Sequence, residues 1–183
     1  MSEQRADYSV GQKIIHWLMA ILLIMDLFVA QKFGGVMEEI DRLESRADHA
    51  SLGTIVTILF MIRLYLRFRH GAPALPAAMS DWQVKAAKIG HGLLYFFIGF
   101  LILSGIATAV NAASPIALFG NLDITIGQTN EETFSSIRVF HEFATNAVIT
   151  LIVLHVLAAF YHLVVMRDRL MQRMLKFWRS EPA

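Results

Sequence analysis

The chain has no cysteine among its 183 residues. This absence excludes disulfides, cysteine-ligated iron–sulfur clusters, zinc–thiolate sites and covalently attached c-type haem. Charged residues are also scarce, at 17%, whereas hydrophobic residues make up 56% of the chain. Such a composition is too apolar for a water-soluble domain of this length, so we expect a lipid bilayer as its surrounding. The formal net charge of +1 gives no indication of nucleic-acid binding.

Four apolar segments are long enough to cross a bilayer, which requires about 20 helical residues. They lie near residues 12–31, 50–68, 89–110 and 141–165. The first segment has no A-x-A-like cleavage site after it and contains His16 and Asp26, which favours a retained helix over a signal peptide. We therefore expect an all-α membrane protein: a single domain over residues 1–183, built as a bundle of four transmembrane helices.

Basic residues predict the orientation of these helices, because they favour cytoplasmic segments. The N-terminal arm, the second connection and the C-terminal tail contain twelve of the sixteen: Arg5, Lys13, Arg63, Arg67, Arg69, Lys85, Lys88, Arg167, Arg169, Arg173, Lys176 and Arg179. The first and third connections contain the other four, together with nine acidic residues: Glu38, Glu39, Asp41, Glu44, Asp48, Asp123, Glu131, Glu132 and Glu142. Both termini are therefore expected on the cytoplasmic side.

Local patterns refine the ends of two helices. The run Ser80-Asp81-Trp82-Gln83 fits a capping box, which predicts that the third helix begins near residue 81. Apolar residues at spacings of three and four, at Ile40, Leu43 and Ala47, indicate that the second helix starts before its apolar segment. The third connection, residues 111–130, shows no clear period and is expected to be an external loop.

Six of the seven histidines lie in or at the ends of the four spans: His16, His49, His91, His141, His155 and His162. An ionisable residue within a membrane is costly, so each of these histidines is a candidate functional residue. His141 and His155 are fourteen residues apart, so they share a helix face at depths about 21 Å apart. The fourth helix therefore offers two imidazoles to the bundle interior.

Depth matching pairs these imidazoles with histidines of other helices. In the expected orientation His16 lies level with His155, and His49 lies level with His141. Two imidazoles facing each other are what a six-coordinate b-type haem requires, so we expect two haems with these four axial ligands. Hydrogen bonding between helices is the alternative reading of each histidine alone. A shared zinc or copper ion fits poorly, because the two pairs are far apart.

Six runs and His162 resemble a known family. Three runs lie in the first three helices: Ile15-His16-Trp17-Leu18, Arg63-Leu64-Tyr65-Leu66-Arg67 and Gly90-His91-Gly92-Leu93-Leu94-Tyr95. The others lie in the fourth helix and the tail: His141-Glu142-Phe143-Ala144, Leu154-His155-Val156-Leu157-Ala158-Ala159 with His162, and Arg167-Asp168-Arg169-Leu170-Met171-Gln172-Arg173-Met174. Over about residues 8–178 the chain resembles the bacterial di-haem cytochrome b561 proteins of the inner membrane, and within them the small superoxide:quinone oxidoreductases. The resemblance implies haem ligation by the two pairs, oxidation of superoxide at the external haem, and reduction of ubiquinone near the cytoplasmic one.

Two basic residues are candidates for attracting superoxide at the external haem. Arg138 lies one turn before His141, and Lys32 follows the first span. The acidic residues around them produce a field that repels an anion, so any attraction must be local.

Four further residues are candidates for the cytoplasmic side. His91 and His162 fit proton donors to a quinone; contacts with haem propionates or lipid headgroups are the alternative. Arg63 and Arg67 share a face and could neutralise propionates or contact anionic lipid. Asp26, a costly carboxylate within the first span, fits either tuning of the outer haem or a protonated acid bonded to a neighbouring helix.

Two functions follow from these observations. The first is a membrane oxidoreductase that oxidises superoxide and reduces ubiquinone. The second is a di-haem anchor subunit that passes electrons between quinone and a soluble dehydrogenase or hydrogenase partner, to which the acidic outer face would suit a basic protein. A haem-free transporter is a third reading, which an absorption spectrum would distinguish.

Overall fold

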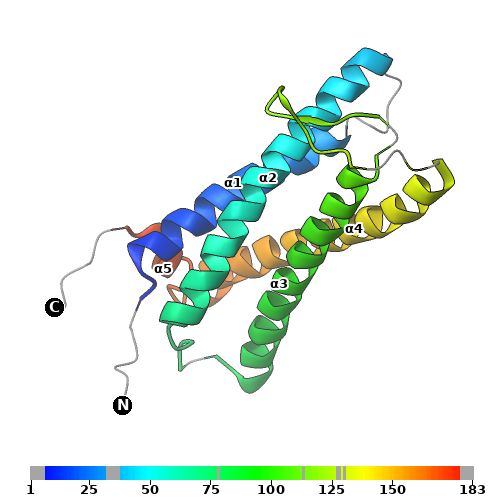
Figure 1. Ribbon diagram of the computed structural model, residues 1–183. Helices are drawn as coiled ribbons and strands as arrows, with labels where there is room; N and C mark the ends of the chain where they lie inside the picture. Colours follow the sequence, from blue (N-terminus) through cyan, green and yellow to red (C-terminus); the bar gives the residue numbers. More distant parts are fainter. Residues whose placement is uncertain are drawn as a thin grey trace.

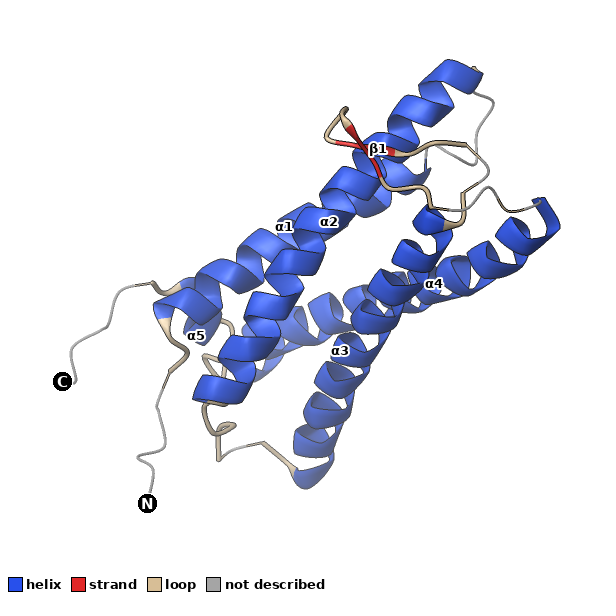
Figure 2. Ribbon diagram, viewed as in Figure 1, coloured by secondary structure: helices blue, strands red, loops and turns tan. Residues whose placement is uncertain are grey.

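The computed structural model describes residues 7–31, 38–77, 79–112, 114–126, 129 and 131–177. Four long helices dominate it: α1 (Val10–Gln31), α2 (Glu39–His70), α3 (Asp81–Val110) and α4 (Glu131–Tyr161). A π-helical turn, η2 (His162–Met166), continues α4, and a short helix α5 (Gln172–Leu175) follows. The predicted four-helix membrane fold is confirmed, since four helices are long and apolar enough to cross a bilayer (Figure 2).

The helix boundaries follow from local chemistry where the sequence offered a signal. α2 begins at Glu39, well before its apolar segment, and α3 begins at Asp81 behind the predicted capping box. In that box the backbone N–H of Ser80 donates to Oε1 of Gln83 at 2.9 Å. The fourth helix differs from the prediction, because it begins at Glu131 rather than near residue 141. Its first turns are mostly polar, so they do not extend the apolar segment, although Phe134 there is buried.

The third connection contains a small β-hairpin that the sequence pattern did not indicate. β1 (Ala117–Leu118) pairs antiparallel with β2 (Leu122–Asp123). The turn between them places Phe119 and Gly120 at positive φ. The backbone N–H of Phe119 donates to Oγ of Ser51 at 2.8 Å, which ties the hairpin to α2. We call this end of the bundle the hairpin end.

The opposite end, which we call the α5 end, holds α5, the start of α1 and the connection between α2 and α3 (Figure 1). The indole N–H of Trp17 donates to the carbonyl of Met174 at 2.9 Å. The ammonium of Lys13, which is 3% exposed, lies 2.7 Å from Oδ2 of Asp7 and 2.5 Å from the carbonyl of Lys176. These contacts hold the C-terminal segment against α1, so both ends of the described chain lie together.

The helices pack as two antiparallel pairs, α1 with α2 and α3 with α4, and α2 contacts α3 less extensively (Figure 1). The buried core between them is apolar: Met19, Leu23, Val56, Leu59, Phe60, Ile98, Leu101, Ala144 and Val148. Many large apolar side chains remain on the outside, among them Phe28 at 71% and Phe68 at 81% exposure. Such a surface is stable only against lipid.

Candidate functional site

At the hairpin end, the imidazoles of His49 on α2 and His141 on α4 face each other. Their ring centres are 6.0 Å apart, and the ring planes are inclined by 63°. An iron atom about 2 Å from a ligating nitrogen lies about 3 Å from the centre of that ring, so two opposed ligands have centres about 6 Å apart. The structure therefore brings this predicted pair together at a separation that suits a planar macrocycle between the rings.

Each ring of the hairpin-end pair has a hydrogen-bond partner at Nδ1. Nδ1 of His49 lies 2.8 Å from Oδ1 of Asp26, and Nδ1 of His141 lies 3.1 Å from the carbonyl of Leu101 and 3.2 Å from Oγ of Ser104. Metal-binding histidines commonly donate one N–H to a carboxylate or carbonyl and use the other nitrogen as ligand. An iron between these rings would accordingly be bound through Nε2 of each.

At the α5 end, His155 on α4 has two imidazole neighbours. The ring of His16 on α1 is 6.4 Å away with a 79° inclination, and the ring of His91 on α3 is 5.4 Å away. The first separation suits opposed ligands of one iron, whereas the second is short for that arrangement. Nδ1 of His91 contacts the carbonyl of Ala87 at 2.7 Å. The geometry therefore favours His16 over His91 as the counterpart of His155.

Nδ1 of His16 is buried and has no hydrogen-bond partner among the residues that the structure describes. Buried polar atoms are rarely left in this state, so the ring fits a site that a further group completes. Within the same described residues, no three His, Asp or Glu side chains are placed to share one metal ion. Opposed pairs of imidazoles are thus the donor arrangement that the bundle offers, and it suits b-type haem.

Arg63 on α2 lies near the α5-end histidines. Its guanidinium carbon lies 5.7 Å from the centre of the Tyr95 ring. Its charge acts on His16, His91 and His155, and Arg67, one turn further along α2, acts on His91. The two predicted arginines therefore lie beside this cluster and could neutralise the acidic groups of a bound cofactor.

His162 pairs with a residue that the sequence reading did not single out. Its Nδ1 lies 2.5 Å from Oδ2 of Asp168, and the side chains are 15% and 8% exposed. Oδ1 of Asp168 accepts the backbone N–H of Leu170 at 3.1 Å, which fixes the carboxylate. The π-helical turn and the left-handed backbone of Arg167 bring Asp168 back toward His162.

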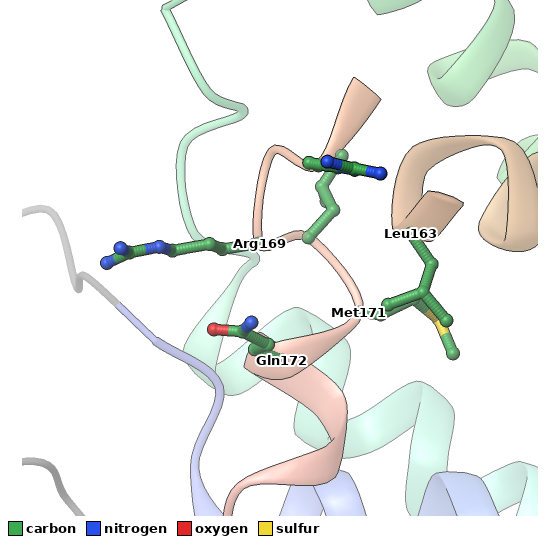
Figure 3. Close-up of a pocket in the computed structure, with 6 residues that line it drawn as sticks. Leu163, Arg169, Met171 and Gln172 are labelled. Carbon is green, nitrogen blue, oxygen red and sulfur yellow. The ribbon is translucent and has the colours of Figure 1, made fainter. Parts of the chain in front are cut away.

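A cavity of about 220 Å³ lies beside this turn, lined by Leu163, Arg167, Arg169, Leu170, Met171 and Gln172. Figure 3 shows the Arg169 side chain directed away from Leu163 and Met171. The cavity lining therefore combines apolar side chains with two arginines and the amide of Gln172.

Of the two residues predicted to attract superoxide, the structure describes Arg138 but not Lys32. Nε of Arg138 donates to Oε1 of Glu142 at 2.8 Å, and both side chains are about half exposed. This ion pair offsets much of the Arg138 charge close to His141. Lys32 lies outside the described residues.

Gly105 on α3 is a site residue that sequence reasoning missed. A Cβ built there would lie 2.9 Å from Cε1 of His141. Real Cβ atoms essentially never approach so closely, so the bare glycine backbone makes room for the imidazole. Only the packing of α3 against α4 identifies this position, because nothing in the local sequence around Gly105 distinguishes it from other membrane glycines.

Comparison with known proteins shows which family this chain resembles. A family model described as prokaryotic cytochrome b561 matches residues 7–177. A probable superoxide oxidase, CybB, of Yersinia pestis is 27% identical over 168 residues, which cover 92% of this chain and 95% of the relative. Cytochrome b561 homolog 1 of Escherichia coli is also 27% identical, covering 92% and 96%. Cytochrome b562 of Cereibacter sphaeroides is 26% identical over 182 residues, covering 94% and 98%.

Proposed function

The chain belongs to the prokaryotic cytochrome b561 family of membrane electron-transfer cytochromes, which bind b-type haem, and we propose that it is a di-haem oxidoreductase that oxidises superoxide and reduces ubiquinone. It is a multi-pass protein of the bacterial inner membrane. In this proposal the hairpin end faces the periplasm and the α5 end faces the cytoplasm, in accord with the acidic and basic connections.

One observation carries the proposal: two pairs of opposed imidazoles, each with ring centres about 6 Å apart. The pair His49 and His141 would hold the outer haem, and the pair His16 and His155 the inner one. Haem bound by two histidines supplies a one-electron carrier without an open coordination position, which suits outer-sphere electron transfer. The two α4 histidines, fourteen residues apart, set the spacing along the membrane normal.

On the periplasmic side, each superoxide gives up one electron and leaves as dioxygen. Arg138 and Lys32 are the cations proposed to attract the anion. Because Arg138 is paired with Glu142 and the surrounding connections are acidic, attraction is weak and short-ranged. The name of the relative from Yersinia pestis is what favours superoxide as the donor.

On the cytoplasmic side, ubiquinone takes up two electrons, from two superoxide ions, and two protons. His91 and His162 are the proposed proton donors, and the buried contact with Asp168 orients His162. Arg63 and Arg67 would neutralise haem propionates or the developing charge on the quinone. The position of Arg63 beside the α5-end histidines supports this role.

A second function, that of a di-haem anchor subunit, is favoured by the charge at the hairpin end. Described acidic side chains there include Glu38, Asp41, Glu44, Asp48, Asp123 and Glu132. Such a surface would suit a basic soluble dehydrogenase or hydrogenase and does not steer an anion. In this case electrons pass between that partner and quinone.

Purification and an absorption spectrum test the haem content, and point variants test the ligands. Replacing His49 or His141 with alanine should remove one haem and leave the other, and replacing His16 or His155 should do the converse. If His91→Ala removed a haem while His16→Ala removed none, the proposed pairing at the α5 end would be wrong.

Stopped-flow mixing of the oxidised protein with superoxide distinguishes the two functions. Haem reduction near the diffusion limit, followed by quinol formation with added ubiquinone, is expected of a superoxide:quinone oxidoreductase. A slow reaction with superoxide, together with rapid reduction by quinol, would support the anchor subunit. A colourless protein would contradict both.

A further inference from the structure

Asp26 is a buried carboxylate in the last third of the transmembrane helix α1, toward the hairpin end. The residue is 6% exposed, and its Oδ1 lies 2.8 Å from Nδ1 of His49 on the neighbouring helix. A carboxylate in this position is costly unless a partner compensates its burial. The imidazole that supplies this compensation belongs to the proposed ligand pair at the hairpin end.

The groups that contact the proposed ligands differ in charge. His49 contacts a carboxylate, whereas Nδ1 of His141 contacts the neutral carbonyl of Leu101 and the hydroxyl of Ser104. At the α5 end, Nδ1 of His16 has no partner among the described residues. A negative group thus touches one ligand of the outer pair.

The charge near the inner pair has the opposite sign. Arg63 acts electrostatically on both His16 and His155. A nearby cation favours the reduced, less positive state of an iron site, and a nearby anion favours the oxidised state. The two ends of the bundle therefore place opposite charges beside their imidazole pairs.

From this asymmetry we infer that Asp26 is a positioning residue of the outer haem: it accepts the Nδ1–H of His49, directs Nε2 of that ring to the iron, and lowers the reduction potential of the outer haem below that of the inner one. The inference rests on the proposed function. A carboxylate partner makes an imidazole a more basic ligand, which stabilises ferric iron. With this order of potentials, transfer of an electron from the periplasmic to the cytoplasmic side is energetically downhill.

The test compares Asp26→Asn with Asp48→Asn in the purified holoprotein. Asn keeps an oxygen that can accept the Nδ1–H of His49 but removes the charge. Asp48 is an exposed acid adjacent to His49 on the same helix. Asp48→Asn therefore also removes one negative charge, but from the solvent-exposed surface. Spectroelectrochemical titration gives both midpoint potentials, and electron paramagnetic resonance of the ferric protein gives a separate signal for each haem. The signal lost in His49→Ala identifies the outer haem.

In Asp26→Asn we expect the ratio of reduced to oxidised outer haem at a fixed ambient potential to rise tenfold or more, which corresponds to about 59 mV. The inner haem should keep its potential, and Asp48→Asn should change neither. A change in the resonance signal of the outer haem alone would accompany the shift. An unchanged outer potential, or equal shifts of both haems, would show that Asp26 is neutral or acts only on packing, and would overturn the inference.

The order of the two potentials in the unsubstituted protein provides a second measurement that does not depend on the Asp26 variant. The inference requires the haem that disappears in His49→Ala to have the lower potential, and the reverse order overturns it. Failure of the proposed function looks different, because the protein would then lack two haems, or His49→Ala would retain both.

Discussion

Replacing Gly105 with alanine should displace the His141 imidazole and weaken binding of the outer haem. The new Cβ would lie 2.9 Å from Cε1 and 3.3 Å from Nδ1 of the ring, whereas ordinary contacts begin at 3.4 Å. The ring must retreat by about half an ångström. It cannot do so freely, because its Nδ1 contacts the carbonyl of Leu101 and the hydroxyl of Ser104 on the same helix as Gly105.

Overpacking of this kind costs about 1–3 kcal/mol. If the whole cost falls on the haem-bound state, affinity for the outer haem decreases by about fivefold to 150-fold. The haem-to-protein ratio from a pyridine haemochrome spectrum measures the loss, and electron paramagnetic resonance shows which of the two ferric signals has changed. We expect a weakened or shifted outer signal and an unchanged inner one.

Gly99→Ala is the matched control on the same helix. A Cβ at Gly99 would meet the Phe60 ring at 3.7 Å and 3.8 Å, which is ordinary van der Waals contact. This variant should retain both haems with native spectra. If Gly105→Ala also retained both haems with native spectra, the placement of His141 against Gly105 would be refuted, and with it the outer-site geometry.

Two further predictions concern the electron acceptor and the electron donor. His162→Ala should slow quinol formation while both haems remain, because a proposed proton donor is lost. Asp168→Asn should slow it to a lesser degree. If His162→Ala turned over as fast as the unsubstituted protein, the proposed role of His162 would be contradicted. Glu142→Gln removes the anion paired with Arg138 and should raise the rate of haem reduction by superoxide severalfold at low ionic strength, with the gain disappearing at high salt. Glu132→Gln, an exposed acid further from His141, is the control, and equal rates for both variants would argue against local attraction by Arg138.

The four spans and the starts of α2 and α3 could be predicted because their causes are local. Long apolar segments partition into lipid whatever their neighbours are, and a Ser80–Gln83 capping box involves residues three apart. The start of α4 at Glu131 was missed because its acidic and hydroxyl residues interrupt the apolar run that marks the span. The hairpin was missed for a related reason, since its strands are two residues long and depend on a contact with Ser51.

Within the site, the sequence determined which histidines stand at which depth, because the rise per residue in a helix is constant. It therefore predicted the two histidine pairs whose ring centres lie 6.0 Å and 6.4 Å apart in the structure. It could not identify Asp168 as the contact of His162, because a π-helical turn and a left-handed residue reverse the chain between them.

What the sequence by itself determined is that this is a membrane bundle with imidazoles at two heights. Only the tertiary structure decided that Asp26 contacts His49 and that Gly105 accommodates His141. These two contacts depend on how each helix is rotated about its own axis and packed against its neighbour. The pairing of Arg138 with Glu142 is a local contact, because the two residues lie four apart on one helix. Composition and spacing specify the height of a residue along a helix, but side-chain packing across the bundle selects the rotation and the rotamer.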